Sequence, residues 1–130
     1  PYHNKNIKFI NSPISKDASG FSTRTIDILN KVKTKYVLYL QDDMWLDKKV
    51  DKQTMLEAFY NVKHFNWNCL KIHNRSWFNY SLSKTNIFAN GIRILKQNND
   101  SEYLLSHNAS IWNREFLLSV MVKKIKEVLK

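Results

Sequence analysis

Two adjacent carboxylates, Asp42 and Asp43, follow directly after an apolar run at residues 36–40 and Gln41. A run of this kind is typical of a strand that is buried on both faces of a parallel sheet. Open α/β sheets bind their ligands just beyond the carboxyl ends of such strands. Neighbouring carboxylates repel each other, and a divalent cation or a cationic ligand between them relieves the repulsion. The junction therefore predicts a metal or nucleotide site, and the alternative is that the acids simply cap a turn or a helix.

A second candidate binding element lies upstream, where Gly20, Ser22 and Arg24 stand at the start of a predicted helix. The amino terminus of a helix attracts anions. The guanidinium of Arg24 adds a fork of donors that suits phosphate or ribose oxygens. Taken alone, the segment is better explained by an ordinary serine cap followed by a solvated arginine.

The order of these two elements along the chain indicates a protein family more specifically than either element does alone. Residues 20–24, a helix, the apolar run 36–40 and then Gln41-Asp42-Asp43 together resemble the nucleotide-sugar-dependent glycosyltransferases of the GT-A fold, of the family-2 type. Residues 106–117 also look similar to the part of that family in which a strand turns into a helix near the acceptor. The resemblance covers roughly residues 15–120.

The resemblance implies an α/β architecture, a Rossmann-like three-layer sandwich with a mostly parallel sheet that is incomplete at both ends. Residues 1–130 would form a single domain, a partial glycosyltransferase catalytic domain. The family's base-recognition strand would precede Pro1 and its general base would follow Lys130, so we expect an internal piece of a longer protein. The implied reaction is direct displacement, in which a sugar moves from a nucleotide diphosphate to a hydroxyl of a glycan, lipid-linked or protein acceptor.

Carried over to this sequence, the resemblance makes Asp43 the ligand of a Mn²⁺ or Mg²⁺ ion that bridges the donor diphosphate. Asp42 would be a second metal ligand or a ribose contact, and Arg24 would lie near the nucleotide. Gln41 stands where the family has its first acid, and this replacement weakens metal binding without abolishing it. Hard cations take few protein oxygens when phosphate and water complete the shell, so one or two carboxylates suffice.

The remaining site residues are weaker candidates. The catalytic base is unknown, and Asp100 and Glu102 are candidates, although a polar turn explains both residues better. His107 could contact the acceptor, a phosphate or the metal on the acceptor side, because imidazole is a common metal ligand. Trp77 could stack on a sugar ring through its apolar face. The competing interpretation gives both of these side chains a structural role only.

Periodicity and capping residues predict the elements that must position these side chains. The predicted strands are 7–10, 36–40, 68–72, 92–96, 103–106 and a short extended piece at 109–112. The predicted helices are 23–33, 52–64 and 114–129, capped by Ser22, Asp51 and Asn113. Residues 73–90 show no clear period and are predicted as a long loop. The first strand, helix and strand form a crossover, and such crossovers make parallel pairs.

Composition limits the classes of function. The net charge is +10 over 130 residues, mostly from lysines spread along the chain. This charge fits a solvated basic surface, or attraction to a phosphorylated ligand, an anionic membrane surface or nucleic acid. Nucleic acid is not favoured, because the chain has no basic block of the usual arm type. The single cysteine, Cys69, excludes an internal disulfide and fits a small buried hydrophobe.

No apolar stretch reaches the length that spans a bilayer, and no signal peptide is recognisable. We therefore expect a cytoplasmic protein, with peripheral membrane association as an option for a lipid-linked acceptor. Two other functions remain open at this point. A metal-dependent nuclease or phosphotransferase would need further acids that converge on Asp42 and Asp43. A non-catalytic basic interaction domain would have no metal site and would bind an acidic partner in a salt-dependent way.

Overall fold

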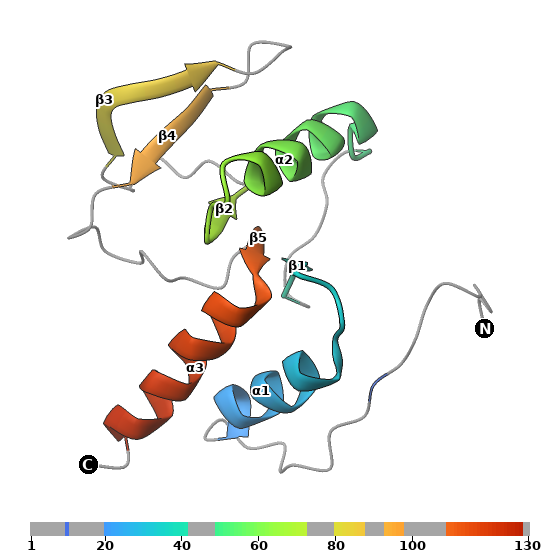
Figure 1. Cartoon of the computed structure of the whole chain (residues 1–130), viewed down its shortest axis with the longest axis vertical. Helices are drawn as coiled ribbons and strands as arrows, with labels where there is room; N and C mark the ends of the chain where they lie inside the picture. The colour runs from blue at the N-terminus through green and yellow to red at the C-terminus, as the bar shows by residue number, and fades with distance from the viewer. Residues whose placement is uncertain are drawn as a thin grey trace. The chain divides into compact units, whose positions relative to one another are not determined.

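The structure is a computed structural model that describes residues 10, 20–41, 49–72, 80–87, 93–97 and 109–128. Within these residues the chain forms three helices and five strands (Figure 1). It divides into two compact units, of which one contains residues 1–35 and 114–130 and the other contains residues 36–113. Two predicted strands lie mainly or wholly outside the described residues, namely 7–10, of which only residue 10 is described, and 103–106.

The first unit is built from α1 (Phe21–Lys31) and α3 (Arg114–Val128), which pack against each other. Buried residues recur at a spacing of four on each helix, so that each pair lies on one helix face. These residues are Thr25 and Leu29 on α1, and Leu117 and Met121 on α3. Both predicted helices are confirmed, with α1 starting and ending two residues earlier than expected.

The start of α1 corrects one predicted cap. The N-cap residue is Gly20, which makes no side-chain capping bond, and Ser22 lies inside the first turn. The prediction was wrong because a serine near a helix start was assigned the capping position by residue type alone. The hydroxyl of Thr25 donates to the Phe21 carbonyl at 3.0 Å, so this buried side chain is satisfied within the helix.

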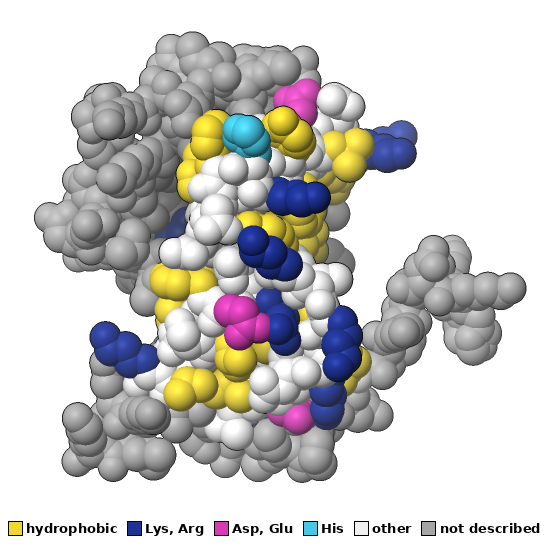
Figure 2. All heavy atoms as spheres, in the orientation of Figure 1, with side chains coloured by type: hydrophobic (Ala, Val, Ile, Leu, Met, Phe, Trp, Pro, Cys, Tyr) yellow, Lys and Arg dark blue, Asp and Glu magenta, His cyan; other side chains and the backbone are white. Residues whose placement is uncertain are grey.

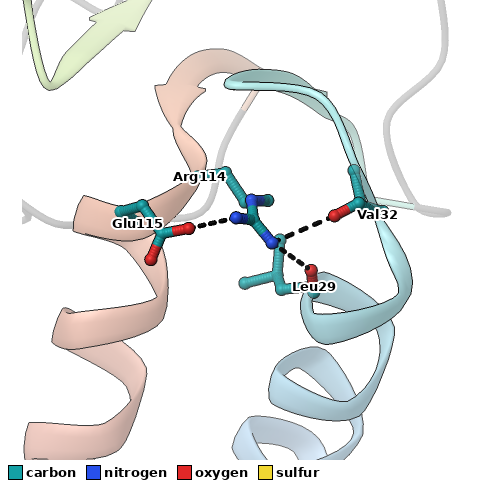
Figure 3. A network of polar contacts seen from close by, with 4 residues as sticks. All are labelled: Leu29, Val32, Arg114 and Glu115. Atoms are coloured by element: carbon teal, nitrogen blue, oxygen red, sulfur yellow. Dashed lines mark hydrogen bonds and ion pairs between the residues drawn. The ribbon is translucent and has the colours of Figure 1, made fainter.

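Arg114 ties the end of α1 to the start of α3 (Figure 3). Its Nη1 atom donates to the carbonyl oxygens of Leu29 at 3.3 Å and Val32 at 3.0 Å. Its backbone N–H donates to the Lys35 carbonyl at 2.9 Å, and its Nη2 atom pairs with Glu115. The last carbonyls of a helix lack partners within the helix, and a cation there also suits the helix dipole. Arg114 therefore caps α1 from the neighbouring helix.

The second unit contains a three-stranded sheet in the order β1-β5-β2. Its strands are β1 (Tyr36–Tyr39), β2 (Cys69–Lys71) and β5 (Ser110–Asn113). Both outer strands pair with β5 in the antiparallel sense. The predicted three-layer Rossmann-like sandwich with a mostly parallel sheet is therefore wrong for this chain.

The apolar run at 36–40 led to the wrong sheet type for a physical reason. It was interpreted as a strand buried on both faces, but Leu38 is 40% exposed and Leu40 is 50% exposed. The fully buried strand is instead β5, where Ser110, Ile111 and Trp112 have no exposed surface. An apolar run indicates a strand, but it does not encode the direction of the partner strand, which here comes from the distant β5.

Helix α2 (Lys52–His64) covers the core of the second unit and begins where the sequence predicts. Asp51 is its N-cap, and its carboxylate accepts from the Gln53 backbone N–H at 3.0 Å and the Thr54 hydroxyl at 2.6 Å. The inner face of α2 meets β5 through a cluster of buried and partly buried apolar side chains. The cluster contains Ala58, Val62, Ile111, Tyr36, Met55, Phe59, Trp67, Leu70 and Ile72.

The cap at Asp51 makes the stability of α2 depend on pH. The pKa of Asp51 lies below its ordinary value because the Thr54 hydroxyl and the Gln53 N–H donate to the charged carboxylate. The cap therefore stabilises fully above the ordinary pKa of an aspartate, and this contribution is lost as the pH falls through the lower folded-state pKa. We expect Asp51→Ala to lower the melting temperature at neutral pH and to have little effect in strong acid.

Thermal unfolding followed by circular dichroism at both pH values checks this expectation. Asp51→Asn is the matched control, because asparagine caps helices about as well as aspartate but does not titrate in this range. An equal loss of melting temperature at both pH values for Asp51→Ala would argue against a charged cap.

A separate two-stranded antiparallel sheet joins β3 (Tyr80–Ile87) to β4 (Arg93–Gln97). The strand predicted at 92–96 is confirmed. The loop predicted over 73–90 is wrong for residues 80–87, which are extended and paired. The register shifts between Ser81 and Thr85. Such an irregularity breaks the two-residue alternation by which a strand is recognised in a sequence.

Candidate functional site

The ends of three chain segments meet at one edge of the three-stranded sheet. Because β1 and β2 are each antiparallel to β5, their carboxyl ends both lie beside the amino end of β5. Tyr39 and Lys71 are both opposite Ser110 in the register, and the Ile72 N–H donates to the Ala109 carbonyl at 3.0 Å. We call the segments 40–41, 72 and 109 the common edge. The predicted position of the site, beyond the carboxyl end of an apolar strand, corresponds to this edge.

Most of the predicted site residues lie outside the described residues. These are Asp42, Asp43, Trp77, Asp100, Glu102 and His107. Gln41, the first position of the acidic motif, is described; it is half-buried and follows β1 by two residues. Arg24 is described as well and lies half-buried in the first turn of α1. The structure thus describes the residues that lead into the acidic motif and the helix start that carries Arg24.

The helix start that carries Arg24 was predicted to attract anions, and the structure describes its first turn. Gly20 is buried and directly precedes α1 as its N-cap residue. No acidic residue occupies the first turn, where it would compete with an anion. The helix dipole favours negative charge at this position. The guanidinium of Arg24, in the first turn of the helix, adds several positively charged hydrogen-bond donors.

Strand β5, whose amino end lies at the common edge, contains a buried polar pair that was not predicted from the sequence. The Trp112 Nε1–H donates to the Ser110 hydroxyl at 2.7 Å, and both residues have no exposed surface. Ser110 carries no signal of its own in the sequence, but alternate residues of a strand share a face, which places position 110 beside the indole of position 112.

Cys69 and Lys71 lie two residues apart on β2, and partial burial changes the titration of both. Burial raises the pKa of the Cys69 thiol to about 12, against a smaller opposing effect of the Lys71 charge. Burial also lowers the pKa of Lys71. A thiol with such a pKa is protonated at neutral pH, and the thiolate is the form that attacks or binds metal. Cys69 therefore serves packing, as its sequence context predicts.

Among the residues that the structure describes, there is no group of three or more His, Cys, Asp and Glu side chains that could hold a metal ion. None of the helices in the described part of the chain is long and apolar enough to cross a membrane.

Comparisons of the chain with protein-family models, with curated proteins and with solved structures give no significant match.

Proposed function

We propose that this chain binds the donor of a metal-assisted glycosyltransferase, which moves a sugar from a nucleotide diphosphate to an acceptor hydroxyl. The observation that carries the proposal is the order of the motifs. Gly20 to Arg24 opens α1, β1 follows, and the chain then runs through Gln41 into Asp42 and Asp43. The antiparallel sheet removes the support that a Rossmann-like sheet would have given. The motif order and the position of Gln41 at the common edge remain as support.

In this proposal the acidic motif holds the metal and the donor. Asp43 is the metal ligand, and Asp42 is a second ligand or a ribose contact. A bound Mn²⁺ or Mg²⁺ ion supplies Lewis-acid neutralisation of the charge on the departing nucleoside diphosphate. The resemblance also assigns Arg24 a role at the nucleotide, and its guanidinium has the donors that suit phosphate oxygens. The net charge of +10 attracts the anionic donor from solution.

On the acceptor side of the proposed site, we name candidate residues and a class of acceptor. His107 precedes Ala109 by two residues in the sequence, and Ala109 belongs to the common edge. Trp77 offers an apolar ring face on which a sugar could stack. Asp100 and Glu102 are candidates for the base that removes the proton of the acceptor hydroxyl. The acceptor is a glycan, a lipid-linked sugar or a protein.

The test is calorimetric titration of the chain with uridine diphosphate, in the presence of Mn²⁺ and again with a chelator. We expect measurable binding that depends on Mn²⁺. We expect Asp43→Asn to reduce the affinity by at least about tenfold to a hundredfold. That is the usual loss when a residue that only supports a metal ligand is changed, and Asp43 is proposed as the ligand itself. Asp51→Asn is the matched control, because it removes the same charge at an exposed position and keeps the helix cap.

The titration and assays of cleavage and sugar release together separate the competing functions. Binding without Mn²⁺, or an unchanged affinity in Asp43→Asn, would contradict the metal role of the acidic motif. A nuclease or phosphotransferase predicts Mn²⁺-dependent cleavage of a phosphodiester or transfer of phosphate, and no sugar release from a uridine diphosphate sugar. A non-catalytic basic domain predicts nucleotide affinity that follows salt concentration and is indifferent to Mn²⁺.

A further inference from the structure

The outer side of α2 exposes large apolar side chains that the core does not use. The inner side of the helix packs on β5 through Ala58 and Val62. On the outer side and at the two ends of the helix, four apolar residues remain between 45% and 65% exposed. These are Val50, Leu56, Tyr60 and Phe65. Isolated exposed apolar residues need no explanation, but a group of them on one helix marks an interaction surface.

The aromatic members of this group are held in a fixed arrangement by ring contacts. The rings of Tyr60 and His64 stack with centroids 5.7 Å apart. His64 meets Phe65 edge-on at 4.8 Å, and Phe65 stacks on Trp67 at 5.1 Å. Figure 2 shows hydrophobic side chains on both sides of the cyan histidine on this face. Offset-stacked and edge-to-face pairs of this kind are favourable, so the exposed rings are kept in place.

Exposed lysines surround the apolar group. Lys49, Lys52 and Lys63 are all exposed. On a helix, positions 52, 56, 60 and 63 lie on one side because their spacings are three, four and seven residues. We call this surface, Lys49, Val50, Lys52, Leu56, Tyr60, Lys63 and Phe65 together, the α2 face. Of the acids nearby, Asp51 is engaged as the helix cap, and Glu57 is half-buried and accepts from Gln53 at 3.0 Å.

We propose that the α2 face binds the surface of a membrane that contains anionic lipids. Lysine is depleted from the centres of protein interfaces, so mixed lysine and apolar residues argue against a protein partner. At a membrane surface the same mixture is favourable, because the lysine stems lie along apolar groups while the ammonium groups reach the lipid phosphates. Aromatic side chains also favour the boundary between headgroups and acyl chains. The net charge of +10 adds a general attraction to such a surface.

Vesicle flotation with the full chain tests the proposal. We expect the chain to float with vesicles of phosphatidylcholine and phosphatidylserine in equal parts, and not with vesicles of phosphatidylcholine alone. Added salt should weaken the binding, because exposed charges are screened. Equal binding to both kinds of vesicle, or to neither, would overturn the proposal.

Paired variants locate the binding surface. Lys52→Gln with Lys63→Gln should weaken binding to the anionic vesicles by about thirtyfold, from the usual contribution of each lysine near such a surface. Leu56→Ser with Tyr60→Ser should also weaken it, although no charge changes. The matched control is Lys33→Gln with Lys123→Gln, which removes the same charge from exposed lysines of the other unit.

The outcomes distinguish this surface from general charge attraction. If the control pair weakens binding as much as the α2 pair, or if Leu56→Ser with Tyr60→Ser has no effect, the α2 face is not the binding surface. Circular dichroism of each variant shows whether it is folded, and the substituted side chains are exposed and make no core contacts. The inference does not depend on the proposed glycosyltransferase function, because the nucleotide titration can fail or succeed without any vesicle binding.

Discussion

Replacing Trp112 by alanine is expected to destabilise the chain by about 3–5 kcal/mol, the usual cost of removing a large aromatic side chain from a core. Trp112 has no exposed surface and lies on β5, the central strand of the three-stranded sheet. It is paired with Val37 on one side and Cys69 on the other. Because a domain of this size has a total stability of about 5–15 kcal/mol, the variant should be partly unfolded under mild conditions.

Urea unfolding followed by circular dichroism measures this effect. Trp112→Phe retains most of the ring volume and should cost less than the alanine substitution. Ser110→Ala leaves the buried Trp112 Nε1–H without its partner and should cost about 1–3 kcal/mol. In the double variant Trp112→Phe and Ser110→Ala this second cost should largely disappear, because both partners are gone. If Trp112→Ala lowered the free energy of unfolding by less than about 1 kcal/mol, the central position of β5 would be contradicted. A change that small is typical of substitutions at exposed positions.

The second large effect is expected at Arg114. Arg114→Met should destabilise the unit formed by α1 and α3 by about 2 kcal/mol, because charged hydrogen bonds to the Leu29 and Val32 carbonyls are lost. The Arg114 side chain is only 23% exposed, so solvent weakens these bonds little. Methionine keeps part of the apolar stem of arginine, so the variant measures mainly the loss of the guanidinium hydrogen-bond donors.

Hydrogen exchange of the backbone amides at the end of α1, together with urea unfolding, measures the loss. Arg114→Lys should recover only part of the stability, because an ammonium group lacks the planar fork of donors. Glu115→Gln is the control. Its side chain is 68% exposed, and an exposed ion pair of this kind contributes about 0–1 kcal/mol. If Glu115→Gln were as damaging as Arg114→Met, the ion pair and not the helix cap would be the source of stability.

The helices could be predicted from the sequence because their signals are local. Asp51 stands immediately before the apolar period of α2 and is the observed N-cap. The apolar spacing of Leu117 and Met121 identifies the buried face of α3 in the same way. The cap of α1 was assigned wrongly to Ser22, since a glycine at the N-cap position gives a weaker signal than a serine two residues later.

The sheet could not be predicted because strand pairing is not local. The run at 36–40 identified β1 correctly, but its partner, β5, lies more than seventy residues further along the chain. Nothing within a four-residue strand states whether the neighbouring strand runs parallel or antiparallel. The same limitation hid β3, whose register shift removes the regular alternation.

Of the candidate site, only the strand that leads into it could be predicted and then compared with the described residues. The acidic motif was predicted to follow the end of a strand, and Gln41 does follow β1 at the common edge. That β2 ends at the same edge follows from the antiparallel pairing of both strands with β5, which the sequence does not reveal. The hydrogen bond between Ser110 and Trp112 is local to β5, where alternate residues share a face, but the burial of both residues could not be predicted without the strands that flank β5.

Electron paramagnetic resonance of Mn²⁺ tests the central claim, that the Gln41-Asp42-Asp43 motif holds a metal with the donor diphosphate. The signal of free Mn²⁺ is recorded while the chain is titrated in, with and without uridine diphosphate, and nucleotide alone serves as the blank. We expect the wild-type chain with nucleotide to remove more free Mn²⁺ than the nucleotide alone, and Asp43→Asn to abolish this excess while Asp51→Asn retains it. If the wild-type chain removes no more Mn²⁺ than the nucleotide alone, the metal-assisted function is contradicted.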